Sequence, residues 1–199
     1  GQPAPGHHDL TLAKANWVSH PHTPLRIDWP LGPHEEKMLI RAEISSDIGE
    51  VRSVHELAFG RPDEANLVDA LRKEGSAVLS IVAAEHEQII GHILFSRMIA
   101  PFRALGLGPV AVLPERQRNG IGSRLIREGL ARARAAGWEG VFVVGDPAYY
   151  RRFGFDACQA SSFQSPYAGA YFMVMALTAG GLPTKSGRID YASPFAALE

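Results

Sequence analysis

The chain has 199 residues, of which 46% are apolar and 21% are charged, as in a typical globular domain with one sizeable core. Its formal net charge of −1 gives no argument for binding to nucleic acid or to an anionic membrane, and we expect neither as a partner. The single cysteine, Cys158, excludes an internal disulfide, and no apolar run is long enough to cross a bilayer. Because the sequence also begins without a signal-peptide pattern, we expect a cytoplasmic protein.

Residues 1–37 differ in composition from the rest, because they hold six of the 14 prolines and five of the eight histidines. They show no clean hydrophobic period, so we expect an extended or disordered N-terminal arm. The spacing of these histidines matches no standard metal site, and we expect no bound metal. One domain is expected over residues 38–178, and residues 179–199 are expected to form a tail on its surface.

The first elements after the arm are a strand and two helices. Met38–Ser45 has the apolar content of a strand. Asp47 is expected to cap a helix of about a dozen residues with an apolar stripe. The sequence Gly60-Arg61-Pro62 ends that helix, and Asp63–Glu74 is predicted as a second one.

Three strands are predicted next. Val78–Ala84 and Ile89–Ile99 are separated by a polar turn and are expected to form an antiparallel hairpin. Leu105–Leu113 is the following strand, in which Gly106, Gly108 and Pro109 fit badly into a regular ladder and predict a bulge. A bulge there would free backbone N–H and C=O groups to pair with a ligand.

A basic turn with two glycines leads from this strand into an amphipathic helix. The turn, Gln117–Gly122, fits a phosphate cradle, because a helix N-terminus offers unpaired N–H donors and the positive end of the helix dipole. It matches neither the triphosphate-binding loop nor the dinucleotide-binding motif. A strand-to-helix loop without a ligand stays open as the alternative. The helix is expected to stop at Gly137.

The last part of the domain begins with a short buried strand, Gly140–Gly145. It is expected to pair in parallel with Leu105–Leu113 through a right-handed crossover. Asp146 then caps a short helix that Pro147 opens. Two final strands are predicted, around Phe155–Ser162 and Tyr171–Leu177. The first of these would place Cys158 in the core as a small apolar residue.

Two of these segments together resemble the GNAT superfamily of N-acetyltransferases. Val112-Leu113-Pro114 followed by Gln117-x-x-Gly120-x-Gly122 is similar to the acetyl-CoA signature of that family. Further along, Tyr149-Tyr150-Arg151-Arg152-Phe153-Gly154-Phe155 is similar to its Tyr-x-x-x-Gly-Phe element. The elements occur in the order and spacing of the family, and the resemblance covers residues 39–178.

The resemblance implies an α/β (α+β) fold with a central mixed, mostly antiparallel sheet flanked by helices. A parallel strand pair in that sheet would open around the cofactor. It also implies acetyl-CoA as cosubstrate and no metal. The strand backbone would pair with the pantetheine arm, and the loop with the first helical turn would hold the pyrophosphate. The residues so implied are Val110, Ala111, Val112, Gln117, Arg118, Asn119, Gly120, Ile121, Gly122 and Ser123.

The resemblance also implies a catalytic residue, Tyr150, which would act as general acid toward the departing thiolate. A packed helix tyrosine with a satisfied hydroxyl is the alternative. Many family members take a base from a strand glutamate, but Leu105–Leu113 contains no ionisable residue. Glu85, His92 or a water held by backbone carbonyls remain as candidates for the base. His92, in mid-strand, also fits a core histidine with paired nitrogens.

The function expected from these features is acetyl transfer from acetyl-CoA to a primary amine by direct attack in a ternary complex. The missing glutamate favours a weakly basic acceptor, because an α-amine titrates near pH 8 and is partly neutral already. An acyl-CoA-binding sensor module with little catalysis is the alternative. Arg151 and Arg152 could reach the 3′-phosphate of CoA or face water. The sequence names no acceptor, and a homodimer is possible because dimers are common in the family.

Overall fold

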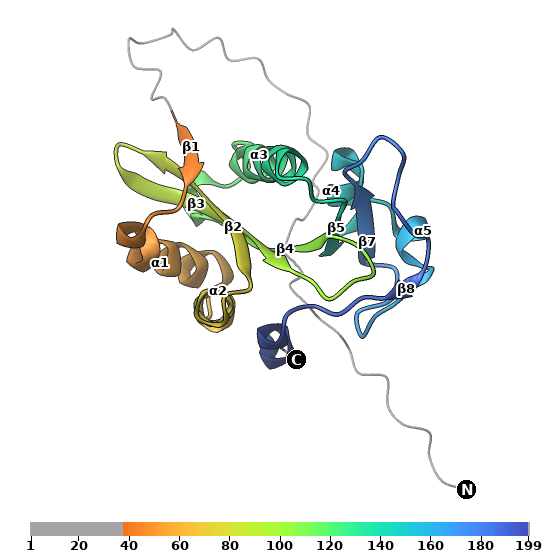
Figure 1. Cartoon of the computed structure of the whole chain (residues 1–199). Coiled ribbons are helices and arrows are strands. Elements are labelled where there is room, and N and C mark those ends of the chain that lie inside the picture. The colour runs from red at the N-terminus through yellow and green to blue at the C-terminus, as the bar shows by residue number, and fades with distance from the viewer. Residues whose placement is uncertain (1–37, 199) are drawn as a thin grey trace, which may run out of the picture.

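The structure, a computed structural model, describes residues 38–198, so the expected N-terminal arm and its histidines lie outside the described residues. Its centre is a six-stranded sheet in the order β1-β2-β3-β4-β5-β7 (Figure 1). The strands are β1 (Leu39–Ala42), β2 (Ala77–Glu85), β3 (Gln88–Arg97), β4 (Ala104–Val112), β5 (Gly140–Val144) and β7 (Phe172–Ala176). A separate two-stranded sheet pairs β6 (Phe163–Gln164) with β8 (Gly187–Arg188).

All neighbouring strands of the large sheet are antiparallel except β4 and β5, which run parallel. This pair is in register only from Ala104 opposite Gly140 to Leu107 opposite Val143. Beyond Leu107, β4 stays paired with β3 on its other side as far as Val112. The predicted mixed sheet, with one parallel pair that opens at its end, is therefore confirmed.

The predicted bulge in β4 is also present. Between two paired positions, Ile93 opposite Val110 and Phe95 opposite Leu107, β4 has one more residue than β3. The extra length falls at Gly108, whose φ of +146° lies in the region that favours glycine. A bulge of this kind bends the strand and turns its free edge.

Helices cover both faces of the sheet, with α1 (Ile48–Phe59) and α2 (Asp63–Glu74) on one face and α3 (Ile121–Ala135) on the other (Figure 1). Leu94 of β3 packs with Leu67 and Leu71 of α2. The next residue, Phe95, points the opposite way and packs against Gly129 of α3. This alternation follows from the period of two in a strand, and it explains why β3 is apolar on both faces.

The helix ends follow the predicted glycines. Gly60 and Gly75 adopt left-handed conformations at the ends of α1 and α2, and Gly137 does the same just after α3. Asp47 occupies the expected N-cap position of α1, but its side chain makes no capping hydrogen bond. Its carboxylate forms an ion pair with Arg41 and accepts a hydrogen bond from the Ile44 N–H group, so it closes the turn before the helix instead.

The strand predicted over Phe155–Ser162 is wrong. The Asp156 side chain accepts a hydrogen bond from the N–H of Cys158 and starts a short helix, α5 (Ala157–Ala160). Cys158 is exposed on that helix and is not a core residue. The local cap overrides a sequence that is otherwise apolar enough for a strand.

The predicted surface location of residues 179–199 is wrong for their second half. There, β8 pairs with β6, and Asp190 pairs with Ile99. Ile189 and Tyr191 are buried, and the last short 3₁₀ helix, η4 (Ser193–Leu198), lies beside α2. In Figure 1 this segment passes from β8 under β4 toward α2. Over the residues that the structure describes, no helix has both the length and the hydrophobicity needed to cross a bilayer.

Replacing Gly129 by alanine should destabilise the protein, although alanine is the better helix former. A Cβ atom there would lie 2.2 Å from the ring of Phe95, which is fully buried and has no space to move into. We expect the overpacking, about 1–3 kcal/mol, to exceed the propensity gain of up to about 1 kcal/mol. Urea unfolding of the variant and the wild type measures the net loss of unfolding free energy.

The matched control is Gly49→Ala in α1, where a Cβ atom would meet nothing within 4 Å. It should leave stability unchanged or raise it by up to about 1 kcal/mol. Equal effects at the two glycines would contradict the close contact between α3 and β3.

Candidate functional site

The edge of β4 that faces away from β3 is the first component of the candidate site. The Leu113 N–H group donates to the Ile90 carbonyl of β3, so in this antiparallel ladder the backbone groups of Ala111 also point to β3. Those of Val110 and Val112 therefore point the other way, where β5 no longer pairs with β4. Of the three predicted strand residues, two can pair with a ligand through the backbone and Ala111 cannot.

The loop that follows is fixed to this edge by its own side chain. The amide nitrogen of Gln117 donates a hydrogen bond of 3.1 Å to the carbonyl of Val112. Arg118 and Gly120 both have positive φ values, +65° and +77°, so the backbone turns sharply twice before the helix begins. Arg118 and Asn119 are exposed, and the space around Gly120 is open.

The N-terminus of α3 opens directly onto this loop. Gly120 is the N-cap residue, and no side chain caps the helix. The first helical hydrogen bond joins the Arg124 N–H group to the Gly120 carbonyl, which leaves the N–H groups of Ile121, Gly122 and Ser123 without a helical partner. These donors and the helix dipole suit an anion. The residues present therefore fit a pyrophosphate, with the buried Ile121 side chain as the anchor of the turn.

A second helix meets the start of α3. It is α4 (Pro147–Tyr150), continued by a 3₁₀ turn, and Asp146 caps it as predicted by accepting from the Ala148 N–H group at 2.8 Å. The Arg152 guanidinium donates to the Ser123 hydroxyl at 3.0 Å and lies 3.9 Å from the centre of the Tyr149 ring. Of the two arginines left open by the sequence, Arg152 therefore faces the loop.

Tyr150, the last residue of α4, lies in an aromatic cluster just beyond the end of β5. Its ring fills the place of a side chain at Gly145, where a Cβ atom would come within 2.3 Å of it. Tyr149 and Phe155 meet it edge to face, with ring centres at 5.1 and 5.8 Å. Burial, with a smaller effect from Tyr149, raises the pKa of Tyr150, so its hydroxyl stays protonated at neutral pH. Among the described residues, no hydrogen-bond partner is found for this hydroxyl.

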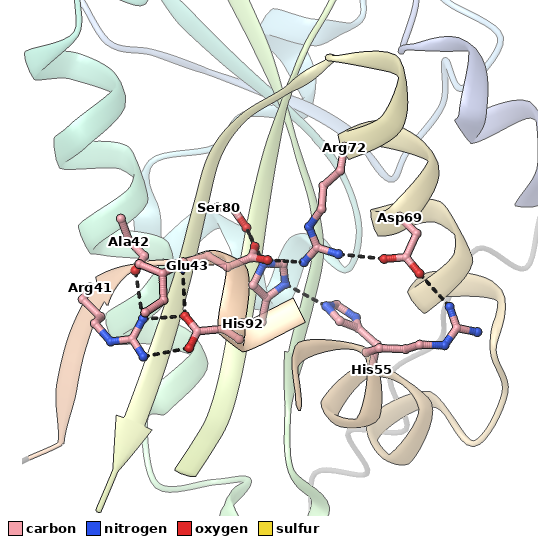
Figure 2. A network of polar contacts seen from close by, with 11 residues as sticks. Arg41, Ala42, Glu43, His55, Asp69, Arg72, Ser80 and His92 are labelled. Atoms are coloured by element: carbon pink, nitrogen blue, oxygen red, sulfur yellow. Dashed lines mark hydrogen bonds and ion pairs between the residues drawn. The ribbon is translucent and has the colours of Figure 1, made fainter. Parts of the chain in front are cut away.

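The two side chains proposed as bases are both engaged. The Glu85 carboxylate forms an ion pair with Arg116. His92 is fully buried, and Ser80 and His55 contact its two ring nitrogens at 2.8 Å each (Figure 2). The expectation of a core histidine with paired nitrogens is confirmed.

His92 belongs to a buried polar network that the sequence reasoning missed. Glu43, just after β1, pairs with Arg72 of α2 at 2.6 Å and accepts a hydrogen bond from Ser80 (Figure 2). Burial alone would raise the pKa of Glu43, but hydrogen bonds from His92, Ser80 and Arg72 lower it to about 2. Burial lowers the pKa of His92. It also lowers the pKa of His55, to well below the usual value of a histidine. The carboxylate is thus charged and both imidazoles are neutral.

The charge on Glu43 fixes the direction of the hydrogen bonds in this network. Ser80 donates to the carboxylate and accepts from Nε2–H of His92, whose Nδ1 then accepts from Nε2–H of His55. The sequence held one signal of this network, a histidine, His55, on the buried face of a predicted helix. Its hydrogen-bond partner, His92, is on β3, and the rest of the network comes from β2, α2 and the residue after β1, which no local pattern links.

Two other features do not coincide with this site. An open groove of about 380 Å³ lies between α2 and η4 and includes none of the predicted cofactor-binding residues. Within residues 38–198, no three side chains of the metal-ligating types come together in a way that could hold a metal ion.

Glu43→Gln should cost about 2 kcal/mol of unfolding free energy at pH 7, because it removes a buried carboxylate that accepts charged hydrogen bonds and leaves Arg72 with Asp69 as its remaining acidic partner. The folded pKa of Glu43 lies below its usual 4.5, so its contribution is present above that value. It is lost as the pH falls toward 2. Urea unfolding between pH 7 and pH 3 should therefore show a smaller acid loss in the variant.

Glu128→Gln serves as the control, since Glu128 pairs with Arg132 at 2.8 Å on the exposed side of α3. It should cost less than about 0.5 kcal/mol. A cost as small as this at Glu43 would show that the buried network does not stabilise the fold.

Comparisons with known proteins match this geometry. Residues 76–157 match the family model of the acetyltransferase (GNAT) domain. The chain is 39% identical over 163 residues to the uncharacterized N-acetyltransferase YjhQ of Escherichia coli (strain K12), an alignment that covers 75% of this chain and 89% of YjhQ.

Two solved structures of relatives share the fold. The GNAT family N-acetyltransferase YhbS from Escherichia coli, in complex with CoA, has a TM-score of 0.76 and 29% identity, covering 89% of this chain and 96% of its own. A GNAT family acetyltransferase from Brucella melitensis, in complex with acetyl-CoA, has a TM-score of 0.69 and 42% identity, covering 80% and 99%. The signature loop, the opened strand pair and these relatives together show that the chain belongs to the GNAT family of N-acetyltransferases.

Proposed function

We propose that this protein transfers an acetyl group from acetyl-CoA to a primary amine by direct attack in a ternary complex. The observation that carries the proposal is the free backbone edge of β4, which leads from the N-terminus of α3 to the opening beside Tyr150. The relatives from Escherichia coli and Brucella melitensis, crystallised with CoA and acetyl-CoA, support the same ligand here.

Binding is assigned to two groups of backbone donors and acceptors. The N–H groups of Ile121, Gly122 and Ser123 bind the pyrophosphate, and the loop from Gln117 to Gly120 shapes the cradle. Val110 offers its outward N–H and C=O groups to the pantetheine arm, in the manner of a neighbouring strand, and Val112 offers its N–H, since its carbonyl already accepts from Gln117. Val110 is nearer than Val112 to the point where β4 and β5 part, and its N–H is the proposed oxyanion donor.

The chemistry requires one proton to leave the amine and one to reach the sulfur, as an N–C bond forms and a C–S bond breaks. Acetyl-CoA, when bound, supplies the thioester. Tyr150 Oη holds the proton that the leaving sulfur takes, and burial keeps that proton in place across neutral pH. No hydrogen-bond partner is found for this hydroxyl among the described residues, so no existing hydrogen bond has to break before the proton is transferred.

The amine itself requires no strong base if it is weakly basic. Glu85 is held by Arg116, and His92 and His55 are fully buried, so none of them is assigned as the base. An α-amine with a pKa near 8 is partly neutral at physiological pH. Water between the outward carbonyls of β4 then suffices to carry its proton away.

Tyr150→Phe should lower kcat about 100-fold, because general-acid catalysis typically contributes that much. The Kd for acetyl-CoA should stay within about twofold, since the binding groups are backbone atoms on β4 and α3. Thiol release measured with a panel of primary amines gives kcat, and calorimetry gives Kd. Tyr171→Phe is the control, because Tyr171 is 58% exposed at the start of β7 and should change neither value.

An acyl-CoA sensor is the second candidate, favoured by the lack of any ionisable side chain on the outward edge of β4. A wild-type protein that binds acetyl-CoA but releases no thiol with any amine would support the sensor. Thiol release that survives unchanged in Tyr150→Phe would remove Tyr150 from the mechanism while leaving the transferase assignment intact.

A further inference from the structure

Two arginine side chains near the start of α3 have no acidic partner among the described residues. Arg152, in the 3₁₀ turn after α4, and Arg127, on α3, are both exposed. None of the ion pairs found within residues 38–198 involves either of them. Arg132 of the same helix, by contrast, pairs with Glu128 at 2.8 Å. The positive charge of Arg127 and Arg152 is therefore left for solvent or for a ligand.

Arg152 is held in place by groups that leave most of its donors unused. Its guanidinium lies 3.9 Å from the centre of the Tyr149 ring and donates a hydrogen bond of 3.0 Å to the Ser123 hydroxyl. A guanidinium carries several N–H donors in its plane, and stacking on a ring does not engage them. In the part of the chain that the structure describes, no second hydrogen bond of this guanidinium is found. Its remaining donors are thus oriented and available to another acceptor.

Arg127 adds a second positive charge at the same place. It follows Ser123 by four residues, so the two side chains lie on the same side of α3. The guanidinium carbons of Arg127 and Arg152 lie 5.4 and 4.9 Å from the centre of the Phe153 ring. Two like charges beside one ring repel each other, and an anion bound there relieves the repulsion. A doubly charged anion suits this cluster best.

The cluster adjoins the cradle proposed for the pyrophosphate. Ser123 contributes its backbone N–H group to the cradle and its hydroxyl to Arg152. The hydroxyl of Tyr149 also comes close to this turn, since a Cβ atom at Gly122 would lie 3.4 Å from it. A group that is bonded within a few atoms of a bound pyrophosphate can therefore reach Arg152.

CoA carries such a group on the nucleotide side of its pyrophosphate. The pantetheine arm leaves the pyrophosphate toward β4, and the ribose leaves it on the other side. That ribose bears a 3′-phosphate, a monoester with about two negative charges at pH 7. Arginine binds phosphate oxygens through two N–H donors at once, which matches the free donors of Arg152.

We propose that Arg152 binds the 3′-phosphate of CoA, with the charge of Arg127 beside it, and that the protein thereby selects CoA over its 3′-dephospho form. The inference rests on the proposed binding of acetyl-CoA and adds the residues that recognise its nucleotide end. Arg152 is a specificity-determining residue in this account and takes no part in acetyl transfer.

The test measures Kd by calorimetry for acetyl-CoA and 3′-dephospho-acetyl-CoA. Wild type should bind acetyl-CoA about 30-fold more tightly than the dephospho compound. Arg152→Gln should bind acetyl-CoA about 20-fold more weakly than wild type does and the dephospho compound within about twofold, because the charged hydrogen bonds are lost with the first ligand alone. In the double variant with Arg127→Gln, the two ligands should bind within about twofold of each other.

Arg103→Gln is the matched control. Arg103 lies 4.9 Å from the centre of the Trp138 ring and donates to the Ala136 carbonyl, so the variant removes the same charge and the same kind of stacking at the other end of α3. The 15 residues of α3 span about 20 Å, which exceeds the Debye length of about 8 Å at physiological salt. Both Kd values should stay within about twofold of wild type. An equal loss of discrimination in Arg103→Gln and Arg152→Gln would refute the proposal.

The two ligands separate the remaining outcomes. An equal loss of affinity for both in Arg152→Gln would put this side chain on the pyrophosphate or in a structural role, and would overturn the inference. Equal binding of both ligands by wild type would also overturn it, and would leave the two arginines to a phosphate ester of another molecule. Binding of neither ligand would remove the proposed cofactor and this inference together. Discrimination without acetyl transfer to any amine would refute the transferase proposal alone.

Discussion

The separation of β4 from β5 after Leu107 is the constraint on which the candidate site depends. A parallel pair that stops early leaves a row of N–H and C=O groups on β4 with no strand beside them. The extra residue at Gly108 bends the strand at this point, while β3 keeps the other edge fixed as far as Val112. The result is a rigid, unpaired edge in the middle of a sheet, which a ligand with amide groups can fill.

The surrounding elements are placed by that opening. Gln117 ties the loop to the end of β4, so the uncapped start of α3 lies where the free edge ends. Gly106 and Gly145 have no side chains, and the space is taken by the rings of Tyr191 and Tyr150. Two glycines at the parting strands thus leave room for two phenol rings, one from α4 and one from the segment before η4, and the chemistry we propose uses Tyr150 for the sulfur.

Local signals in the sequence predicted most of the framework. Gly60 ends the first helix, and the second helix, Asp63–Glu74, has the predicted bounds, because caps and apolar periods act within a few residues. Long-range contacts could not be predicted. The Asp47 carboxylate pairs with Arg41 instead of capping the helix. His55 bonds to His92, 37 residues away on β3, and Tyr191 is far in sequence from the strand residue Gly106 that its ring covers.

The central claim is that the loop at the start of α3 binds acetyl-CoA, and calorimetric titration with a Gly120→Trp variant tests it most directly. Gly120 and Gly75 both have positive φ values, +77° and +79°, with open space around them, so Gly75→Trp imposes the same backbone strain at the end of α2. We expect micromolar binding by wild type and Gly75→Trp, and at least about 30-fold weaker binding by Gly120→Trp, a loss of roughly 2 kcal/mol. Absence of binding by wild type, or equal affinity in all three proteins, would contradict the account.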